Sequence, residues 1–189
     1  GPLDFSMNGC DTRGLANTLR TQVDQQAGRS FQHYLWYMGT RASGCSWSGL
    51  AQTGSPQGPA RDTWYNASEG CVVLVQEPGH NFGMQHSSAL RCNGSPFSDD
   101  PNACEHDEYG DRYDPMGGAC RHMNVWQKAY QGWFGGCNSV RIGTSGTYTL
   151  LPTETPCDGI QVLQIPMARA RPFTRPAGGG GNGGTDQMR

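Results

Sequence analysis

The sequence predicts an α+β domain in which a small twisted sheet packs with three main helices and disulfides stabilise the fold. Segments with helical spacing of apolar residues alternate with short segments rich in aromatic and β-branched residues. The chain has 189 residues, enough to bury a core, and its 28 Gly and 12 Pro indicate many turns. Its eight cysteines are an even number without a zinc-finger pair, which favours disulfides in an oxidising compartment.

The first helix is predicted over residues 11–27. Asp11 or Thr12 can cap its N-terminus, and Gly28 can end it in a left-handed conformation. One side of this helix is expected to be buried, because apolar residues recur there at helical spacing, namely Leu15, Leu19 and Val23.

Strands are predicted in four segments. Residues 31–38 are typical of a buried, aromatic-rich strand on which His33 is partly buried, and shorter strands are expected near 45–52 and 61–65. Residues 147–166 indicate a hairpin-like pair of strands around a loop that contains Pro and Gly.

Two more helices and a long loop region follow. The second helix is predicted over residues 69–83, with a capping box at 66–69 and buried positions at Val72, Val73 and Val75. Residues 87–120 hold three cysteines and many turn-forming residues, which indicates loops held by disulfides. The third helix is expected over 124–133, with Asn124 as its cap. Its apolar stripe is predicted to pack into the core and consists of Val125, Trp126, Ala129, Tyr130 and Trp133.

Residues 7–176 are expected to form one domain, with residues 1–6 a remnant of cloning and 177–189 a flexible Gly-rich tail. No apolar run is long enough to span a bilayer. The net charge is −2 and Lys and Arg do not cluster, so neither nucleic acid nor a membrane is an expected partner. Sequons at Asn66 and Asn93 agree with a secreted glycoprotein, and we expect a monomer.

A pattern of metal-ligand and acid–base residues lies near the end of the second predicted helix. Gln76 and His80 are four residues apart and share one face of the helix, and Glu77 lies beside them. Gly83 can end the helix and let the chain bring His86 to the same ion. Three protein ligands leave one position for water, which is typical of a catalytic metal site. Glu77 is placed to take the proton of that water, whose pKa the metal lowers.

A second feature lies between this pattern and the third predicted helix. Asp114-Pro115-Met116-Gly117 has the composition of a tight turn. A methionine in such a turn can form an apolar floor beneath metal ligands, whereas a lone methionine more often belongs to an ordinary core. The position of Met116 after the pattern of residues 76–86 favours the floor.

Together these residues resemble the metzincin signature H-E-x-x-H-x-x-G-x-x-H with its Met-turn, except that Gln76 replaces the first histidine. Q-E-x-x-H is similar to the gametolysin family of extracellular metalloproteases, and the similarity covers roughly residues 9–168. The resemblance implies a metzincin-like fold and a secreted, zinc-dependent endopeptidase that degrades extracellular-matrix or cell-wall glycoproteins. It also implies roles at the site, with Gln76, His80 and His86 as zinc ligands, Glu77 as general base and Met116 as turn methionine.

Departures from this family leave alternatives open. Gln76 offers a neutral oxygen, a weaker zinc donor than imidazole, so another divalent metal is an alternative. As a surface or capping residue, Gln76 would leave only two protein ligands. Pro78 removes a backbone donor inside a helix at a cost of about 3 kcal/mol, and we expect a local kink. Where many metzincins have a tyrosine that holds the oxyanion, this chain has Gly118, which leaves as candidates Tyr109, Tyr113, Arg121 and His122.

Other interpretations concern function. His106 lies in an acidic segment that is either a second cation site, for example for calcium, or a solvated loop, and contains Glu105, Asp107, Glu108 and Asp111. A non-catalytic pseudoprotease that binds extracellular glycoproteins would have no need of Glu77. A structural zinc domain would need a fourth ligand. In a protease, the peptide substrate is expected to lie along an edge strand near 45–52, beside Trp47 and Leu50.

Overall fold

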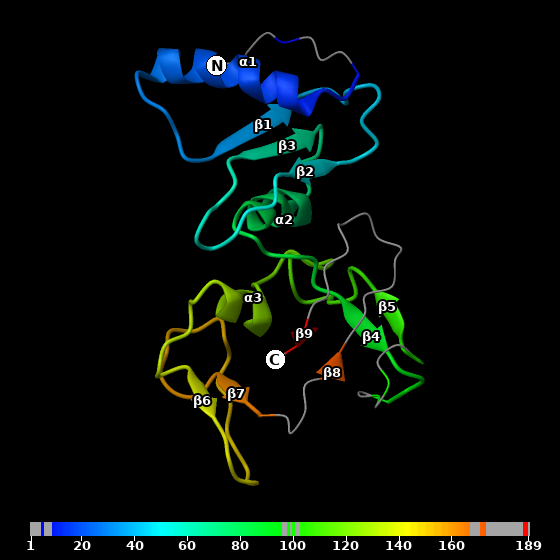
Figure 1. Ribbon diagram of the computed structural model, residues 1–189, viewed down its shortest axis with the longest axis vertical. Helices are drawn as coiled ribbons and strands as arrows, with labels where there is room; N and C mark the ends of the chain where they lie inside the picture. The colour runs from blue at the N-terminus through cyan, green and yellow to red at the C-terminus, as the bar shows by residue number, and fades with distance from the viewer. Residues whose placement is uncertain are drawn as a thin grey trace. The chain divides into compact units, whose positions relative to one another are not determined.

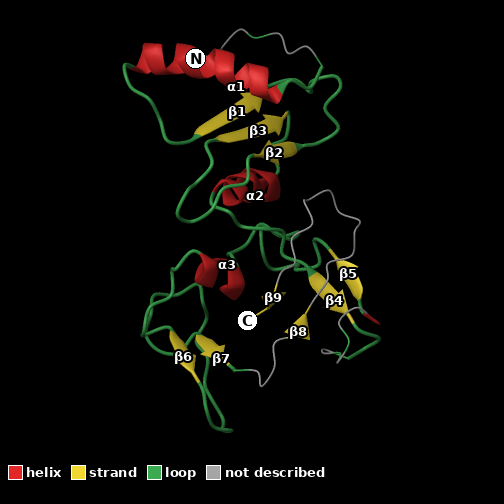
Figure 2. Ribbon diagram, in the orientation of Figure 1, coloured by secondary structure: helices red, strands yellow, loops and turns green. Residues whose placement is uncertain are grey.

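The α+β class is confirmed by a computed structural model of the chain (Figure 2), which describes residues 5, 9–95, 98, 100, 103–166, 171–172 and 187–188. Helices and small sheets alternate along this part of the chain. The chain divides into two compact units, Gly1–Gln85 and His86–Arg189. Most of the predicted cloning remnant and of the Gly-rich tail lies outside the described residues.

The first unit is a three-stranded sheet between two helices (Figure 1). The strand order is β1-β3-β2, with β1 parallel and β2 antiparallel to β3. Successive side chains of β3 point to opposite faces of the sheet, so that Trp64 packs with α1 and the Tyr65 hydroxyl reaches α2. The elements are α1 (Thr12–Ala27), β1 (Tyr34–Met38), β2 (Gly49–Ala51), β3 (Asp62–Asn66) and α2 (Cys71–Asn81).

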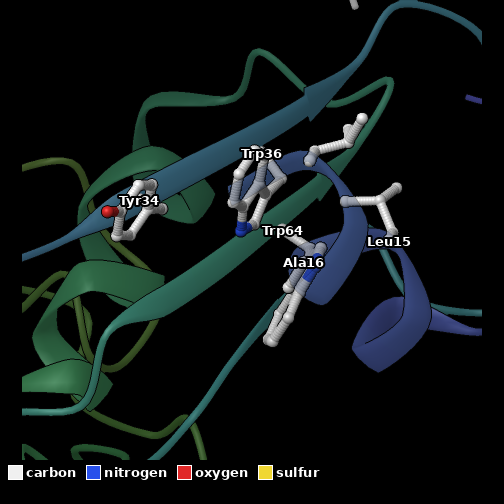
Figure 3. Close-up of a cluster of buried hydrophobic side chains, with 6 residues drawn as sticks. Leu15, Ala16, Tyr34, Trp36 and Trp64 are labelled. Atoms are coloured by element: carbon white, nitrogen blue, oxygen red, sulfur yellow. The ribbon is translucent and has the colours of Figure 1, made fainter. Parts of the chain in front are cut away.

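The core of this unit lies between α1 and the sheet, where aromatic rings of β1 and β3 meet aliphatic side chains of the helix (Figure 3). Its buried members are Leu15, Ala16, Leu19, Tyr34, Trp36 and Trp64. The helix forms where it was predicted. The Asp11 carboxylate accepts a hydrogen bond from Gly14 N at 2.8 Å, and Gly28 has a φ of 65° at the C-terminal cap.

Two predictions about burial in the first unit are wrong in detail. The strand predicted over 31–38 is not buried throughout, because β1 is an edge strand that exposes Leu35 and Tyr37. His33 is partly buried as predicted, and its ring contacts that of Phe82 with centroids 5.0 Å apart and an interplanar angle of 43°. Among the helix positions expected to be buried, Val75 is exposed.

The predicted capping box at 66–69 does not form. The N-cap of α2 is Gly70, which makes no side-chain capping bond. Asn66 instead belongs to β3 and is buried, and its Nδ2 donates to Cys45 O and Trp47 O. Burial and these hydrogen bonds disfavour glycosylation of Asn66. The Asn93 side chain is exposed, and its glycosylation stays a prediction.

The second unit consists of short elements joined by loops (Figure 1). The hairpin predicted over 147–166 is wrong, because β7 pairs in parallel with β6, and the described residues 147–161 contain no strand. Two further strand pairs are β4 with β5 and β8 with β9. The elements are β4 (Ala89–Arg91), β5 (Glu105–Asp107), α3 (Val125–Tyr130), β6 (Ser139–Arg141), β7 (Val162–Gln164), β8 (Arg171–Pro172) and β9 (Gln187–Met188).

α3 has its predicted cap but not its predicted buried face. The Asn124 side chain accepts from Gln127 N at 2.9 Å. The apolar stripe is exposed, with Trp126 at 66% and Trp133 at 58%, whereas the polar Gln127 is buried. The helix is only six residues long and packs through a polar network, so helical spacing of aromatics did not identify its buried side.

All eight cysteines are in disulfides, as predicted, and none is free. Three of the bonds join Cys10 to Cys45, Cys92 to Cys104 and Cys137 to Cys157. The described helices include none with the length and apolar character that a membrane crossing requires.

Candidate metal and catalytic site

α2 carries three of the predicted site residues. Gln76 and Glu77 lie in the middle of the helix and are 8% and 7% exposed. The alternative that Gln76 is a surface or capping residue is therefore wrong. His80 follows four residues after Gln76, so the two side chains project from one side of the helix. Two side chains can bind the same ion from one helix only if they lie on the same face, and the Gln76 amide and the His80 imidazole meet this condition.

Glu77 packs against the edge strand of the sheet. A Cβ added to Gly49 of β2 would lie 2.5 Å from Oε1 of Glu77 and 2.5 Å from Cγ1 of Val73. The pKa of Glu77 is raised to about 7 by burial, which disfavours its charged form. The pKa of Tyr65 is raised to about 12, first by burial and then by the negative charge of Glu77. A carboxyl group with a pKa near neutrality can both take up and release a proton at physiological pH.

The protein without a bound metal is expected to lose stability through Glu77 as the pH rises. The folded-state pKa is raised from 4.5 to about 7, so this contribution to stability is complete below pH 4.5 and is lost as the pH rises through 7. The full effect is up to about 3 kcal/mol. Urea unfolding should show the wild type losing more stability than Glu77→Gln between about pH 4 and pH 8. Parallel pH profiles would contradict the raised pKa.

A tyrosine of the sheet explains how Pro78 is tolerated inside α2. Pro78 has no N–H to donate to the carbonyl of Leu74, four residues earlier in the helix. The hydroxyl of Tyr65 donates to that carbonyl at 3.2 Å. The acceptor that proline leaves without its helical donor is therefore satisfied from β3, and the same bond ties the middle of α2 to the sheet.

A double-mutant cycle tests this pairing of Tyr65 with Pro78. Tyr65→Phe should lower the free energy of unfolding by about 1 kcal/mol, because the Leu74 carbonyl loses its donor. In the Pro78→Ala background the backbone gains an N–H that can bond to the same carbonyl, so Tyr65→Phe should cost less. Equal costs in the two backgrounds, measured by urea unfolding, would count against the account.

The C-terminal end of α2 is fixed by Asn81, directly after His80. The Asn81 side chain is 2% exposed. Its Nδ2 donates to Gln52 O at 2.9 Å and to Asp62 O at 3.0 Å, and its Oδ1 accepts from the Thr63 hydroxyl. These bonds join the end of the helix to the sheet and its β2 edge, and so restrict the position of His80.

The tautomer of His80 follows from its acceptor. Nδ1 of His80 lies 2.8 Å from the backbone carbonyl oxygen of Met84, which can only accept. Nδ1 therefore carries the proton, and the lone pair of the neutral ring lies on Nε2. Gly83, with a φ of 87°, provides the turn that brings Met84 back to the ring. Histidine ligands of metals are commonly held in this way.

His86 begins the second unit and has a similar arrangement. Its Nδ1 lies 2.7 Å from Oε1 of Glu108, and its ring contacts that of Tyr109 with centroids 4.2 Å apart. A carboxylate accepts, so Nδ1 donates and the lone pair of the neutral ring again lies on Nε2.

The predicted Met-turn lies next to the His86 segment within the second unit. Ser87 N donates to Met116 O at 2.9 Å, and Met116 is fully buried. The buried Asp114 carboxylate accepts from Met116 N at 2.6 Å and also from Asn124 N. A Cβ on Gly117 would overlap Asp111 O, so the turn requires glycine there. The turn thus joins the chain after His86 to the start of α3, while the role of Met116 beneath an ion stays a prediction.

Three carboxylates of the acidic segment 105–111 have individual partners. Asp107 pairs with Arg91 at 2.6 Å, Glu108 contacts His86, and Asp111 accepts from Asn124 and from Tyr113 N. The calcium site remains a prediction without an observation that favours it. Among the candidate oxyanion donors, Tyr109 is the one in ring contact with His86.

Within the described parts of the chain, no three His, Cys, Asp or Glu side chains are grouped so that they could hold a metal ion. The proposed ligand set contains only two residues of these types, because its third member is Gln76. No protein-family model, curated protein or solved structure matches this chain. The resemblance to metzincins and to the gametolysin family therefore rests on the residues of the site.

Proposed function

We propose that this chain is the catalytic domain of a secreted, zinc-dependent endopeptidase in which Gln76, His80 and His86 hold the ion. The observation that carries the proposal is the tautomer of the two imidazoles, His80 and His86. Each has Nδ1 placed against an acceptor, Met84 O for one and Glu108 for the other, which directs the lone pair to Nε2. The disulfides agree with an extracellular location.

In this proposal both imidazoles bind one ion. Two imidazole nitrogens and one amide oxygen are a donor set that zinc accepts, although the oxygen binds zinc less tightly than a third imidazole would. A bound zinc ion would polarise the peptide carbonyl and lower the pKa of water.

Glu77 supplies the proton transfer in this proposal. Its carboxylate takes a proton from the attacking water and returns it to the leaving amine. Both steps need a group whose pKa lies near neutrality, and the pKa of Glu77 is raised to about 7. Burial provides that pKa in the zinc-free protein. A domain that only binds a partner has no use for a buried carboxyl at this position, which costs stability at neutral pH.

The peptide substrate is expected to extend along β2, which forms one edge of the described sheet. Leu50 on this strand is 37% exposed and can contact a substrate, whereas Trp47 packs against the core beneath α1. The structure therefore does not support the expectation that Trp47 contacts the substrate. A substrate strand paired with β2 would lie beside Gly49, which contacts Glu77.

Gly49→Ala tests whether Glu77 must occupy its position against β2. The added Cβ would overlap the Glu77 carboxylate and displace it. This displacement should lower kcat/KM for peptide hydrolysis by about 10- to 100-fold, while zinc stays bound. Gly39→Ala is the matched control, because nothing lies within 4 Å of an added Cβ there. Equal activity in both variants would contradict the role given to this contact.

Hydrolysis of a general protein substrate tests the proposed function as a whole. Activity should disappear when a chelator removes the metal and should return when zinc is added. Zinc binding without hydrolysis of any substrate would instead support the non-catalytic pseudoprotease. Restoration by a different divalent ion, and not by zinc, would assign another metal to the site.

A further inference from the structure

Glu108 is fixed next to His86 by the pairing of β4 with β5. Glu108 directly follows β5, and the hydroxyl of Ser88, directly before β4, donates to Glu108 O at 3.0 Å. Ala89 pairs with Asp107 in the antiparallel register. Two chain segments that are 22 residues apart are thus held together at the point where the Glu108 carboxylate meets the His86 ring.

The ring of His86 is restrained at two places. Oε1 of Glu108 lies 2.7 Å from Nδ1, and the Tyr109 ring lies against the imidazole at an interplanar angle of 41°. The hydrogen bond defines which nitrogen carries the proton, and the ring contact restricts rotation about the side-chain bonds. The side chains of His86 and Glu108 are 21% and 27% exposed, so the bond is partly shielded from water.

We propose that Glu108 is a positioning residue for His86: its carboxylate holds the imidazole in the tautomer and orientation that binding a metal through Nε2 requires. The tautomer part of this proposal stands on the geometry alone, and the metal part rests on the proposed function. His80 receives the same restraint from a backbone carbonyl, which substitution cannot remove. At His86 the acceptor is a side chain, so substitution of Glu108 should change the affinity of the site for zinc.

The tautomer of His86 is measured first, in the zinc-free protein, by long-range proton–nitrogen NMR at a pH where the imidazole is neutral. The wild type should show a proton on Nδ1. Glu108→Ala and Glu108→Met both remove the acceptor, and they should shift the ring toward the form with its proton on Nε2. If one of the two variants fails to fold, the tautomer can still be measured in the other. An unchanged tautomer in the folded variants would overturn the proposal.

Zinc affinity is measured next, by competition with a chelator of known affinity. Glu108→Ala and Glu108→Met should weaken zinc binding by about 10- to 100-fold, and Glu108→Gln by less, because an amide oxygen can still accept. Asp107→Asn is the matched control. It removes the neighbouring carboxylate, which pairs with Arg91, and should leave zinc affinity and the His86 tautomer unchanged.

His86→Ala separates failure of this proposal from failure of the proposed function. If His86→Ala leaves zinc affinity unchanged, the proposed ligand set is wrong. The effect of Glu108 on the tautomer of His86 is then still decided by the NMR measurement alone. If His86→Ala abolishes zinc binding and the Glu108 variants keep wild-type affinity, Glu108 does not position a ligand and only this inference is overturned.

Discussion

Glu77→Gln is expected to lower kcat for peptide hydrolysis by about 100- to 10,000-fold, because an amide cannot accept the proton of the attacking water. The substitution keeps the shape of the side chain and leaves the proposed ligands in place, so zinc should remain bound with similar affinity. Steady-state kinetics on a fluorogenic peptide, with metal content determined on the same sample, measure both quantities.

Glu69→Gln is a suitable control for this result. Glu69 is an exposed carboxylate that accepts a hydrogen bond from Tyr37, and its substitution should leave turnover unchanged. Turnover of Glu77→Gln equal to that of the wild type would remove the general base from the account. Loss of zinc together with turnover would show that Glu77 acts on the metal and not on the water.

His80→Ala and His86→Ala are each expected to weaken zinc binding by more than about 100-fold and to abolish hydrolysis. Removal of a group that only supports a ligand already costs about 10- to 100-fold, so removal of the ligand itself should cost more. Gln76→Ala should weaken zinc binding less than either change, because an amide oxygen is the weakest of the three donors. Gln76→His should retain or tighten it.

His33→Ala is the control for these variants, since His33 is a partly buried histidine whose ring contacts that of Phe82. Its zinc affinity should equal that of the wild type. Unchanged affinity in Gln76→Ala would show that the site has two protein ligands. Unchanged affinity in either histidine variant would show that the ion, if bound, lies elsewhere.

Elements with strong local signals were predictable from the sequence. α1 has a capping side chain, apolar residues at helical spacing and a glycine at its end, and it forms where these signals place it. Asn124 caps α3 as predicted. The α3 aromatics and residues 147–161 were not predictable, because their environment depends on contacts with distant segments. Trp126 has helical spacing but is exposed, while Gln127 is buried through its bond to the Ser87 hydroxyl.

The residues of the candidate site are a prediction from the sequence, but the sequence did not predict their partners. Pro78 did carry a signal, because a proline inside a helix implies a carbonyl four residues earlier that needs another donor. Nothing in the sequence identified Tyr65 as that donor. Glu108 belonged to an acidic segment with several interpretations, and only the pairing of β4 with β5 shows that it meets His86.

A crystal structure of the zinc-loaded protein, with the ion located by its anomalous scattering, tests the ligand set most directly. The account predicts one zinc ion at about 2.0–2.2 Å from Oε1 of Gln76, Nε2 of His80 and Nε2 of His86, with a water molecule as fourth ligand. An ion bound through Nδ1 of either histidine, or bound by other residues, would contradict it.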